Sequence, residues 1–129
     1  MAHPQQGRAH SKAFPRRSEI WLIALDPTIG HEIKKTRPAV IVQNDITNEY
    51  LRTTIVVPLT TTVRVPLSPT HVLIERGTPS GLDITSVALF EQMRVVDRVR
   101  LIKHIGRLDE RSVGQADEAI AITLGLKRL

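Results

Sequence analysis

The sequence predicts a mainly β protein with a single α-helix near its C-terminal end. Short runs of β-branched residues, such as 38–42 and 53–59, are separated by turns rich in glycine, proline and asparagine. Apolar residues then recur at helical spacing at Val113, Ala116 and Ile120. Several short strands followed by one helix are typical of a small, partly open antiparallel barrel with the helix packed on it.

Length and composition favour one domain. The chain has 129 residues, of which 41% are hydrophobic and 24% charged, as in ordinary globular proteins. There is no cysteine, which excludes disulfides and thiolate metal sites. No apolar run approaches the roughly 20 residues of a membrane span, and the start of the sequence lacks the apolar segment of a signal peptide. We therefore expect a cytoplasmic protein without membrane contact.

The net charge of +5 comes largely from the first residues of the chain. Residues 1–17 carry four basic side chains and no acidic one, so the remainder is close to neutral. The isoelectric point is therefore no argument for nucleic-acid binding by the folded part. Residues 1–16 show no periodicity, and we expect a disordered basic tail followed by a single domain over 17–129.

The first two predicted strands enclose a basic loop. Residues 19–25 form the first strand, and residues 39–43 form the second, whose unbroken apolar run indicates burial on both faces. Arg37 stands directly before Pro38, which biases it towards an extended backbone. The guanidinium is thus held at the mouth of a buried strand, where it could bind a phosphate. Alternatively, Arg37 ends the strand by pairing with a carboxylate.

The rest of the chain alternates short strands with turns. After the second strand, pattern and turn residues predict a polar segment over 44–52 with about one helical turn, a strand over 53–59, a loop over 63–69 and a strand over 71–74. A turn over 77–81 follows, and then one long strand over 86–96 with a bulge near Glu91, a helical turn over 99–102 and a strand over 104–107. The last element is a helix over 110–124, which is capped by Asp109 and buries Val113, Ala116, Ile120 and Leu124.

Polar residues converge at one end of the predicted sheet. Because consecutive strands usually lie side by side, the end of the first strand, the start of the second and the end of the third share this end. It gathers a carboxylate, an imidazole, three cations and several hydroxyls, namely Glu32, His31, Lys34, Lys35, Arg37 and Thr60 to Thr62. Cations and hydroxyls of this kind suit a phosphodiester.

Neither a metal nor a nucleotide cofactor is expected. His31, Glu32, Asp45 and His71 show no ligand spacing, and no glycine-rich phosphate-binding motif occurs. RNA can still be cut without a metal, because its own 2′-hydroxyl can attack the adjacent phosphorus. This route needs a base, a proton donor for the 5′ oxygen and a cation for the phosphorane.

Six segments in order resemble the MazF/PemK (Kid-type) toxins of type II toxin–antitoxin modules. The segments are EIWLIALDPTIGHE, KTRPAVIVQND, TTIVVPLTT, PTHVLIERG, SVALFEQMRVVD and RLIKHIGRLD. The resemblance implies an SH3-like barrel, shared with the CcdB toxins, that acts as a homodimer. It also implies a metal-independent endoribonuclease of single-stranded RNA that leaves a 2′,3′-cyclic phosphate and a 5′-hydroxyl. The implied partner is a cognate antitoxin, which we expect to inhibit through an acidic, disordered C-terminal segment.

The resemblance also assigns site residues. It implies that Arg37, Thr60 and Glu32 are catalytic, and that Glu91, Gln92 and Arg94 approach the RNA. His31 stands where many family members have serine. We count His31, Lys34, Lys35 and Thr61 with the RNA contacts, because they share the predicted end of the sheet. His71, in an apolar strand, is expected to be a hydrogen-bonded structural residue.

The role of each catalytic candidate has an alternative. An arginine side chain stays protonated at neutral pH and is a poor base, so stabilisation of the phosphorane is favoured for Arg37. Thr60 either donates a hydrogen bond to the phosphoryl oxygen or caps backbone at the strand end. Glu32 is a general base, an RNA contact or the partner of a lysine. At the level of the whole protein, the alternatives are a CcdB-like gyrase-binding toxin and a catalytically silent binding barrel.

Overall fold

The computed structural model describes residues 14–25 and 36–129 of the protein. Four predicted site residues, His31, Glu32, Lys34 and Lys35, lie outside the described residues. The strands and helices of the described part are β1 (Glu19–Ala24), β2 (Thr36–Ile41), α2 (Asp45–Tyr50), β3 (Thr53–Thr60), β4 (His71–Ile74), β5 (Ser86–Leu89), the 3₁₀ turn η1 (Phe90–Gln92), β6 (Arg94–Asp97), the 3₁₀ turn η2 (Arg98–Arg100), β7 (Leu101–Arg107) and α3 (Glu110–Thr123).

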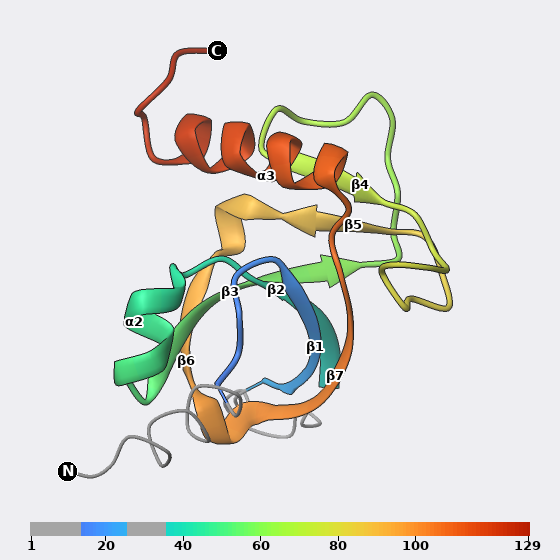
Figure 1. Ribbon diagram of the computed structural model, residues 1–129. Coiled ribbons are helices and arrows are strands. Elements are labelled where there is room, and N and C mark those ends of the chain that lie inside the picture. The colour runs from blue at the N-terminus through green and yellow to red at the C-terminus, as the bar shows by residue number, and fades with distance from the viewer. Residues whose placement is uncertain (1–13, 26–35) are drawn as a thin grey trace, which may run out of the picture.

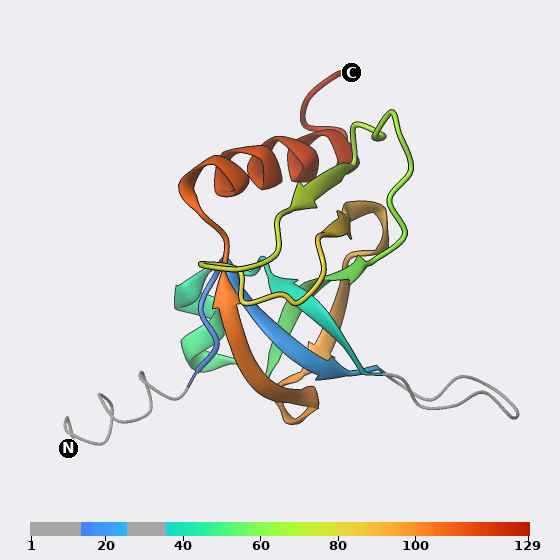
Figure 2. The same ribbon diagram turned by 90° about the vertical axis from the view of Figure 1, so that its right-hand side faces the viewer.

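All strand pairs are antiparallel, in the order β4-β5-β3-β2-β1-β7, and β6 also pairs with β3. Strands β1, β2, β3, β6 and β7 curl around a common centre, while β5 and β4 extend the sheet towards α3 (Figures 1 and 2). The mainly β fold with one C-terminal helix and the adjacency of the first three strands are confirmed. The barrel is partly open, since the sheet pairs neither β6 with β7 nor β4 with β7.

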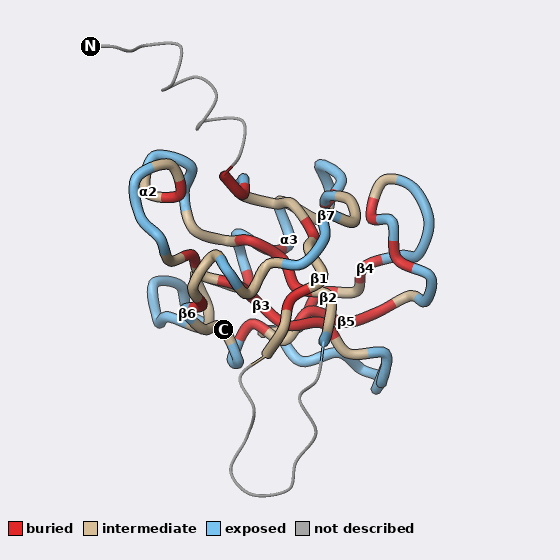
Figure 3. Tube along the Cα trace, turned by 90° about the horizontal axis from the view of Figure 1, so that it is seen from below, coloured by how far each residue is buried: buried red, intermediate tan, exposed pale blue. Residues whose placement is uncertain are grey.

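Two apolar clusters form on opposite faces of the sheet, because neighbouring residues of a strand point to opposite sides. On one face, Val57 and Leu59 belong to the cluster that packs against Ala116 and Ala119 of α3. On the other face, Val56 joins a smaller cluster built by β1, β2, β3 and β6. Buried stretches gather in the middle of the strands, with exposed loops around them (Figure 3). This division decides which side chains are available at the surface.

The predicted long strand over 86–96 is interrupted. Between Ala88, opposite Leu59, and Arg94, opposite Val56, β3 advances by three residues while the partner segment advances by six. The three extra residues form η1, at the place where a bulge was predicted. Alternating apolar residues cannot reveal this change, because β3 pairs with β5 and then with β6 in two different registers. The turn places Glu91 and Gln92 outside the sheet.

Helix α3 follows the prediction closely. Asp109 caps it, since its carboxylate accepts a hydrogen bond of 2.8 Å from the backbone N–H of Ser112. This bond is the main reason why the pKa of the Asp109 carboxyl lies below its usual range. The predicted apolar stripe is buried at Ala116, but Leu124 lies at the C-terminal cap and is exposed. The helix thus ends one residue earlier than predicted, and Ile120 is the last member of the stripe that packs against the core.

The packed part of the chain begins before the predicted boundary. Phe14 and Pro15 are buried, and the Arg16 guanidinium lies 4.7 Å from the centre of the Phe14 ring. Arg17 joins this segment to α3, because its guanidinium donates a 2.7 Å hydrogen bond to Asp117. The burial of this segment could not be predicted, because so few residues show no periodic pattern of apolar side chains. Residues 1–13 lie outside the described part.

Candidate functional site

The ends of three strands meet as the sequence predicted. A groove of about 340 Å³ opens where β1 ends, β2 begins and β3 ends, beside the turn that joins β5 to β6. Its lining combines apolar and basic or amide side chains: Leu25, Arg37, Pro58, Thr60, Leu89, Gln92 and Arg94. Four of the residues predicted for the site therefore share one surface, although they span 57 positions of the sequence, from 37 to 94.

Strand register places Arg37 and Thr60 on the same face. β2 pairs with β3 so that Ala39 stands opposite Pro58. Arg37 and Thr60 each lie two residues further along, and residues two apart on a strand point to the same side. A guanidinium and a hydroxyl therefore face the same groove from adjacent strands. Pro38 is accommodated because β2 pairs at this position with Leu22 of β1, before its pairing with β3 begins at Ala39.

Arg94 adds a second guanidinium to this face. It stands opposite Val56 of β3, and Val56, Pro58 and Thr60 alternate onto the same side. Behind them lies the smaller apolar cluster, whose members Ile23 and Val56 are fully buried. The two arginines thus sit at the rim of a buried apolar floor, which fixes the position of their backbones.

Arg37 is available for a ligand within the described part of the chain. It is half-buried, and no carboxylate among residues 14–25 and 36–129 forms an ion pair with it. The alternative in which Arg37 serves only to pair with a carboxylate finds no support there. Two guanidiniums at one groove generate a positive potential that suits an anionic backbone such as phosphodiester.

A second groove, of about 470 Å³, continues the first. The two share Thr60, Leu89 and Gln92. The second is completed by residues of the loop after β3, of β4, of β5 and of η1, namely Thr62, Arg64, Leu67, His71, Val87 and Glu91. A single extended ligand could therefore cross both grooves and pass over Thr60 at their junction.

Glu91 is held at the far side of this second groove. One carboxylate oxygen accepts a 3.1 Å hydrogen bond from the Thr70 hydroxyl, and the other lies 3.0 Å from Nε2 of His71. Partial burial alone would raise the pKa of the Glu91 carboxyl. The hydrogen bonds from His71, from its own backbone N–H and from Thr70 outweigh that effect and leave the pKa below its usual range. Glu91 is therefore an anion that braces β4 against η1.

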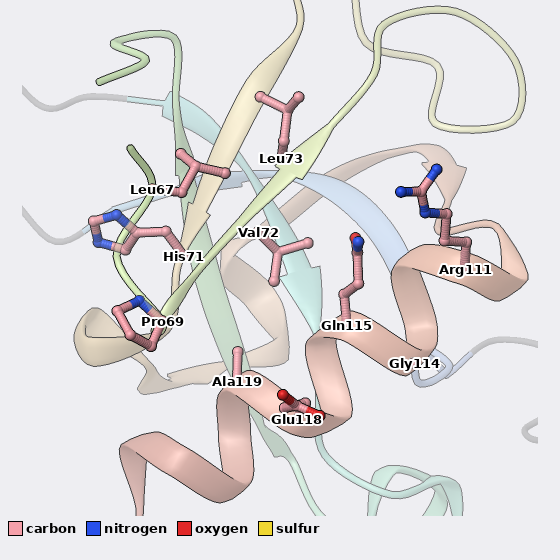
Figure 4. A pocket seen from close by; sticks show the side chains of 10 residues that line it. All are labelled: Leu67, Pro69, His71, Val72, Leu73, Arg111, Gly114, Gln115, Glu118 and Ala119. Atoms are coloured by element: carbon pink, nitrogen blue, oxygen red, sulfur yellow. The ribbon is translucent and has the colours of Figure 1, made fainter. Parts of the chain in front are cut away.

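A third groove, of about 570 Å³, runs between β4 and α3. Val72 of β4 and Gln115 of α3 point into the space between the two elements (Figure 4). Leu67 and His71 line both this groove and the second one, so the two surfaces adjoin. The loop before β4 flanks it with three exposed apolar side chains, Val63, Val65 and Leu67.

The structure brings together Arg37, Thr60, Gln92 and Arg94, and places Glu91 on the adjoining groove. Thr61 is exposed and lines neither of these two grooves. The sequence analysis did not select Arg64 or His71 as groove residues. His71 was expected to be structural, and its hydrogen bond to Glu91 bears this out while placing the ring at the groove. His71 and Glu91 are 20 positions apart, so the sequence alone does not reveal this contact.

The described residues contain no group of three or more His, Cys, Asp or Glu side chains arranged to hold a metal ion. Within the same residues, no helix is long and apolar enough to cross a membrane.

Comparison with known proteins decides the family. Residues 16–124 match the model of the PemK-like, MazF-like toxin of type II toxin–antitoxin systems. The chain belongs to this family. The match covers the whole sheet and α3, including both strands that carry Arg37 and Thr60.

Similar proteins agree with this assignment. Over 111 residues, 86% of this chain, it is 40% identical to the endoribonuclease MazF of Staphylococcus saprophyticus and 36% identical to the endoribonuclease EndoA of Bacillus subtilis, covering 92% and 95% of those proteins. A mycobacterial endoribonuclease solved in complex with its cognate antitoxin shares the fold, with a TM-score of 0.71 at 23% identity. That comparison covers 89% of this chain and 99% of the solved one. The CcdB/PemK-like fold class is thereby confirmed.

Proposed function

We propose that this MazF/PemK-family protein is a metal-independent endoribonuclease toxin that cuts single-stranded RNA, including mRNA, at selected sequences. The observation that carries the proposal is that Arg37 and Thr60, each two residues beyond the Ala39–Pro58 pair, line the same groove. The naming of two relatives, 36% and 40% identical, as endoribonucleases supports the same activity. Because its substrate would be mRNA, the proposal places the protein in the cytoplasm.

The proposed reaction is internal transesterification. The ribose 2′-oxygen attacks the adjacent phosphorus, the P–O5′ bond breaks, and the products carry a 2′,3′-cyclic phosphate and a 5′-hydroxyl. Negative charge accumulates on the phosphoryl oxygens of the phosphorane. The Arg37 guanidinium offsets this charge and the Thr60 hydroxyl donates a hydrogen bond to one oxygen. Arg94 and Gln92 hold the flanking nucleotides.

Two proton transfers complete the balance. A base accepts the proton of the 2′-hydroxyl, and an acid returns one to the leaving 5′-oxygen. We assign the base to Glu32, the carboxylate that the family motif places in the loop before Arg37. Glu91 is a weaker choice, because both of its oxygens already accept hydrogen bonds from Thr70 and His71. His31, Lys34 and Lys35 of the same loop would contact the RNA backbone.

The mechanism is tested by the substrate itself. Purified protein should cut a short RNA in excess EDTA at an undiminished rate. It should fail on a matched oligonucleotide in which only the scissile ribose carries a 2′-hydrogen. Moving the single deoxy position two nucleotides away provides the control, which should still be cut. Cleavage of the scissile-deoxy substrate would exclude attack by the 2′-hydroxyl.

The proposal includes a homodimer. The loop that flanks the β4–α3 groove exposes Val63, Val65 and Leu67, and Val65 is 83% exposed. Clustered apolar side chains of this kind mark contact surfaces in soluble proteins. A second copy seated there would also adjoin the RNA groove through Leu67. Sedimentation of wild type against Val65→Glu would test this face, since a buried charge should dissociate the dimer.

The proposed inhibitor is a cognate antitoxin, as seen in the complex of the mycobacterial structural neighbour. Its inhibitory segment would be acidic, mimicking the RNA phosphates at Arg37 and Arg94, and disordered until bound. Labelled uncleavable RNA titrated with the antitoxin peptide should be displaced completely. The Lys34→Glu/Lys35→Glu double substitution should weaken the binding of both the RNA and the antitoxin peptide. A stable ternary complex would locate inhibition on another surface.

A further inference from the structure

The hydroxyl of Thr60 has a fixed partner inside the protein. Its Oγ1 accepts a hydrogen bond of 3.2 Å from the backbone N–H of Thr62, two residues ahead. The backbone of Thr60 is fixed as well, because Thr60 ends β3 and stands opposite Val87 of β5. Both the main chain and the side-chain oxygen are thereby positioned before any ligand arrives.

This contact determines what the hydroxyl can do next. A threonine hydroxyl has one proton and two lone pairs. The N–H of Thr62 occupies one lone pair, so the proton must point elsewhere. Thr60 lines both grooves, and its neighbours in the first are apolar side chains, the Arg37 and Arg94 guanidiniums and the Gln92 amide. Guanidiniums cannot accept a hydrogen bond. No hydrogen bond from the hydroxyl to an acceptor is found within the described residues.

We infer that the Thr62 amide is a positioning group for the reaction: it turns Thr60 into a donor aimed at the groove where the phosphoryl oxygen binds. The inference rests on the proposed function, which assigns Thr60 to that oxygen. A donor that is oriented in advance needs no reorganisation when charge develops, which is the usual source of transition-state stabilisation. The methyl group of Thr60 supplies a second constraint on its rotamer.

The experiment removes the N–H of Thr62 and keeps its side chain. Incorporating the α-hydroxy analogue of threonine at position 62 replaces the peptide N–H by an ester oxygen and keeps the side chain. The matched control carries the same change at Val63, whose amide lies one residue further along the same loop and whose side chain, the part of Val63 at the proposed dimer face, is kept. Both esters are made on wild type and on Thr60→Ala. Single-turnover cleavage rates and the Kd for an uncleavable RNA are measured for each protein.

The ester at position 62 should lower the single-turnover rate about three- to ten-fold, the worth of one net hydrogen bond. The Kd for uncleavable RNA should stay unchanged, and the ester at 63 should cut at the wild-type rate. On Thr60→Ala, the ester at 62 should have no further effect, because the amide acts only through that hydroxyl.

Three outcomes would overturn the inference. Equal losses from both esters would indicate a general effect on the loop. An equal loss on the Thr60→Ala background would show that the amide acts independently of the hydroxyl. An unchanged rate for the ester at 62, beside an impaired Thr60→Ala, would leave the proposed function intact and remove only the role of the amide. A fully active Thr60→Ala would instead contradict the role of Thr60 in the proposed function.

Discussion

The two faces of β3 differ in what their side chains contact. Val57 and Leu59 point into the cluster covered by α3, where side chains from strands β1 to β5, from η1 and from α3 pack together. Val56, Pro58 and Thr60 point to the opposite face, which ends in a groove with two arginines. The strand thus stabilises the fold through one set of residues and, in the proposed function, positions Thr60 for the reaction through the set between them. It should be possible to damage either property while sparing the other.

Removal of Arg37 should give the largest loss of activity. Arg37→Ala should lower the single-turnover rate by about 10²- to 10³-fold, as expected for a donor aimed at developing charge. Its free energy of unfolding should stay within about 1 kcal/mol of wild type, since the side chain lies at the rim of the sheet. Arg37→Lys should recover little, because an ammonium lacks the planar fork of the guanidinium. An active Arg37→Ala would move the chemistry elsewhere.

The opposite face should respond in the opposite way. Ile20 is fully buried in the cluster under α3. Ile20→Ala should lower the free energy of unfolding by about 2–5 kcal/mol, through lost burial and the cavity left behind. Below its melting temperature, the variant should still cut RNA at close to the wild-type rate. A specific loss of rate in a fully folded Ile20→Ala would show that the two faces are coupled.

The helices and strands could be predicted from the sequence more accurately than the changes of strand pairing between them. Helical spacing and Asp109 were enough to place α3, and the adjacency of consecutive strands was enough to bring Arg37 near Thr60. The break at η1 was not predictable as a change of register, because the same apolar pattern serves pairing with β5 or with β6. Burial of Phe14 was missed because the contact partners of a short segment carry no periodic signal.

Some site features depend on contacts between distant segments. The hydrogen bond between His71 and Glu91 joins residues 20 positions apart, and nothing in the sequence indicates that the two side chains are in contact. The approach of Arg94 to the groove was expected only from the resemblance to the toxin family. Strand register supplies the physical reason, because Arg94 stands opposite Val56 and so shares a face with Thr60.

The brace at Glu91 should make a smaller, pH-dependent contribution. Because the pKa of Glu91 is lowered in the folded protein, its stabilisation is complete above the unfolded pKa of about 4.3. It is then lost as the pH falls through the folded pKa below that value. The melting temperature of Glu91→Gln should therefore lie below wild type at pH 7, with the gap narrowing towards pH 3.

Thr70→Val provides the matched control, because it removes one of the hydrogen bonds that hold the carboxylate. It should reproduce part of the pH-dependent gap and leave the rest to His71 and to the backbone N–H of Glu91. A gap between wild type and Glu91→Gln that is independent of pH would show that the side chain acts through its shape alone.

The smallest effects should come from the start of the chain. A variant that begins at Phe14 should match full length in melting temperature and cleavage. A variant that begins at Arg16 should melt lower, because it lacks the buried Phe14 and Pro15 and the ring beneath the Arg16 guanidinium. Equal stability of the two variants would show that this segment contributes nothing to the fold.

The central claim, that Arg37 and Thr60 act as one unit on the same phosphoryl group, is tested most directly by single-turnover cleavage. Wild type, Arg37→Ala, Thr60→Ala and the double variant are compared in EDTA on one RNA, with the product ends identified by mass spectrometry. We predict that the double variant is little slower than Arg37→Ala alone, as for groups that work together. A loss in the double variant equal to the product of the two single losses, or full activity in either single variant, would contradict the account.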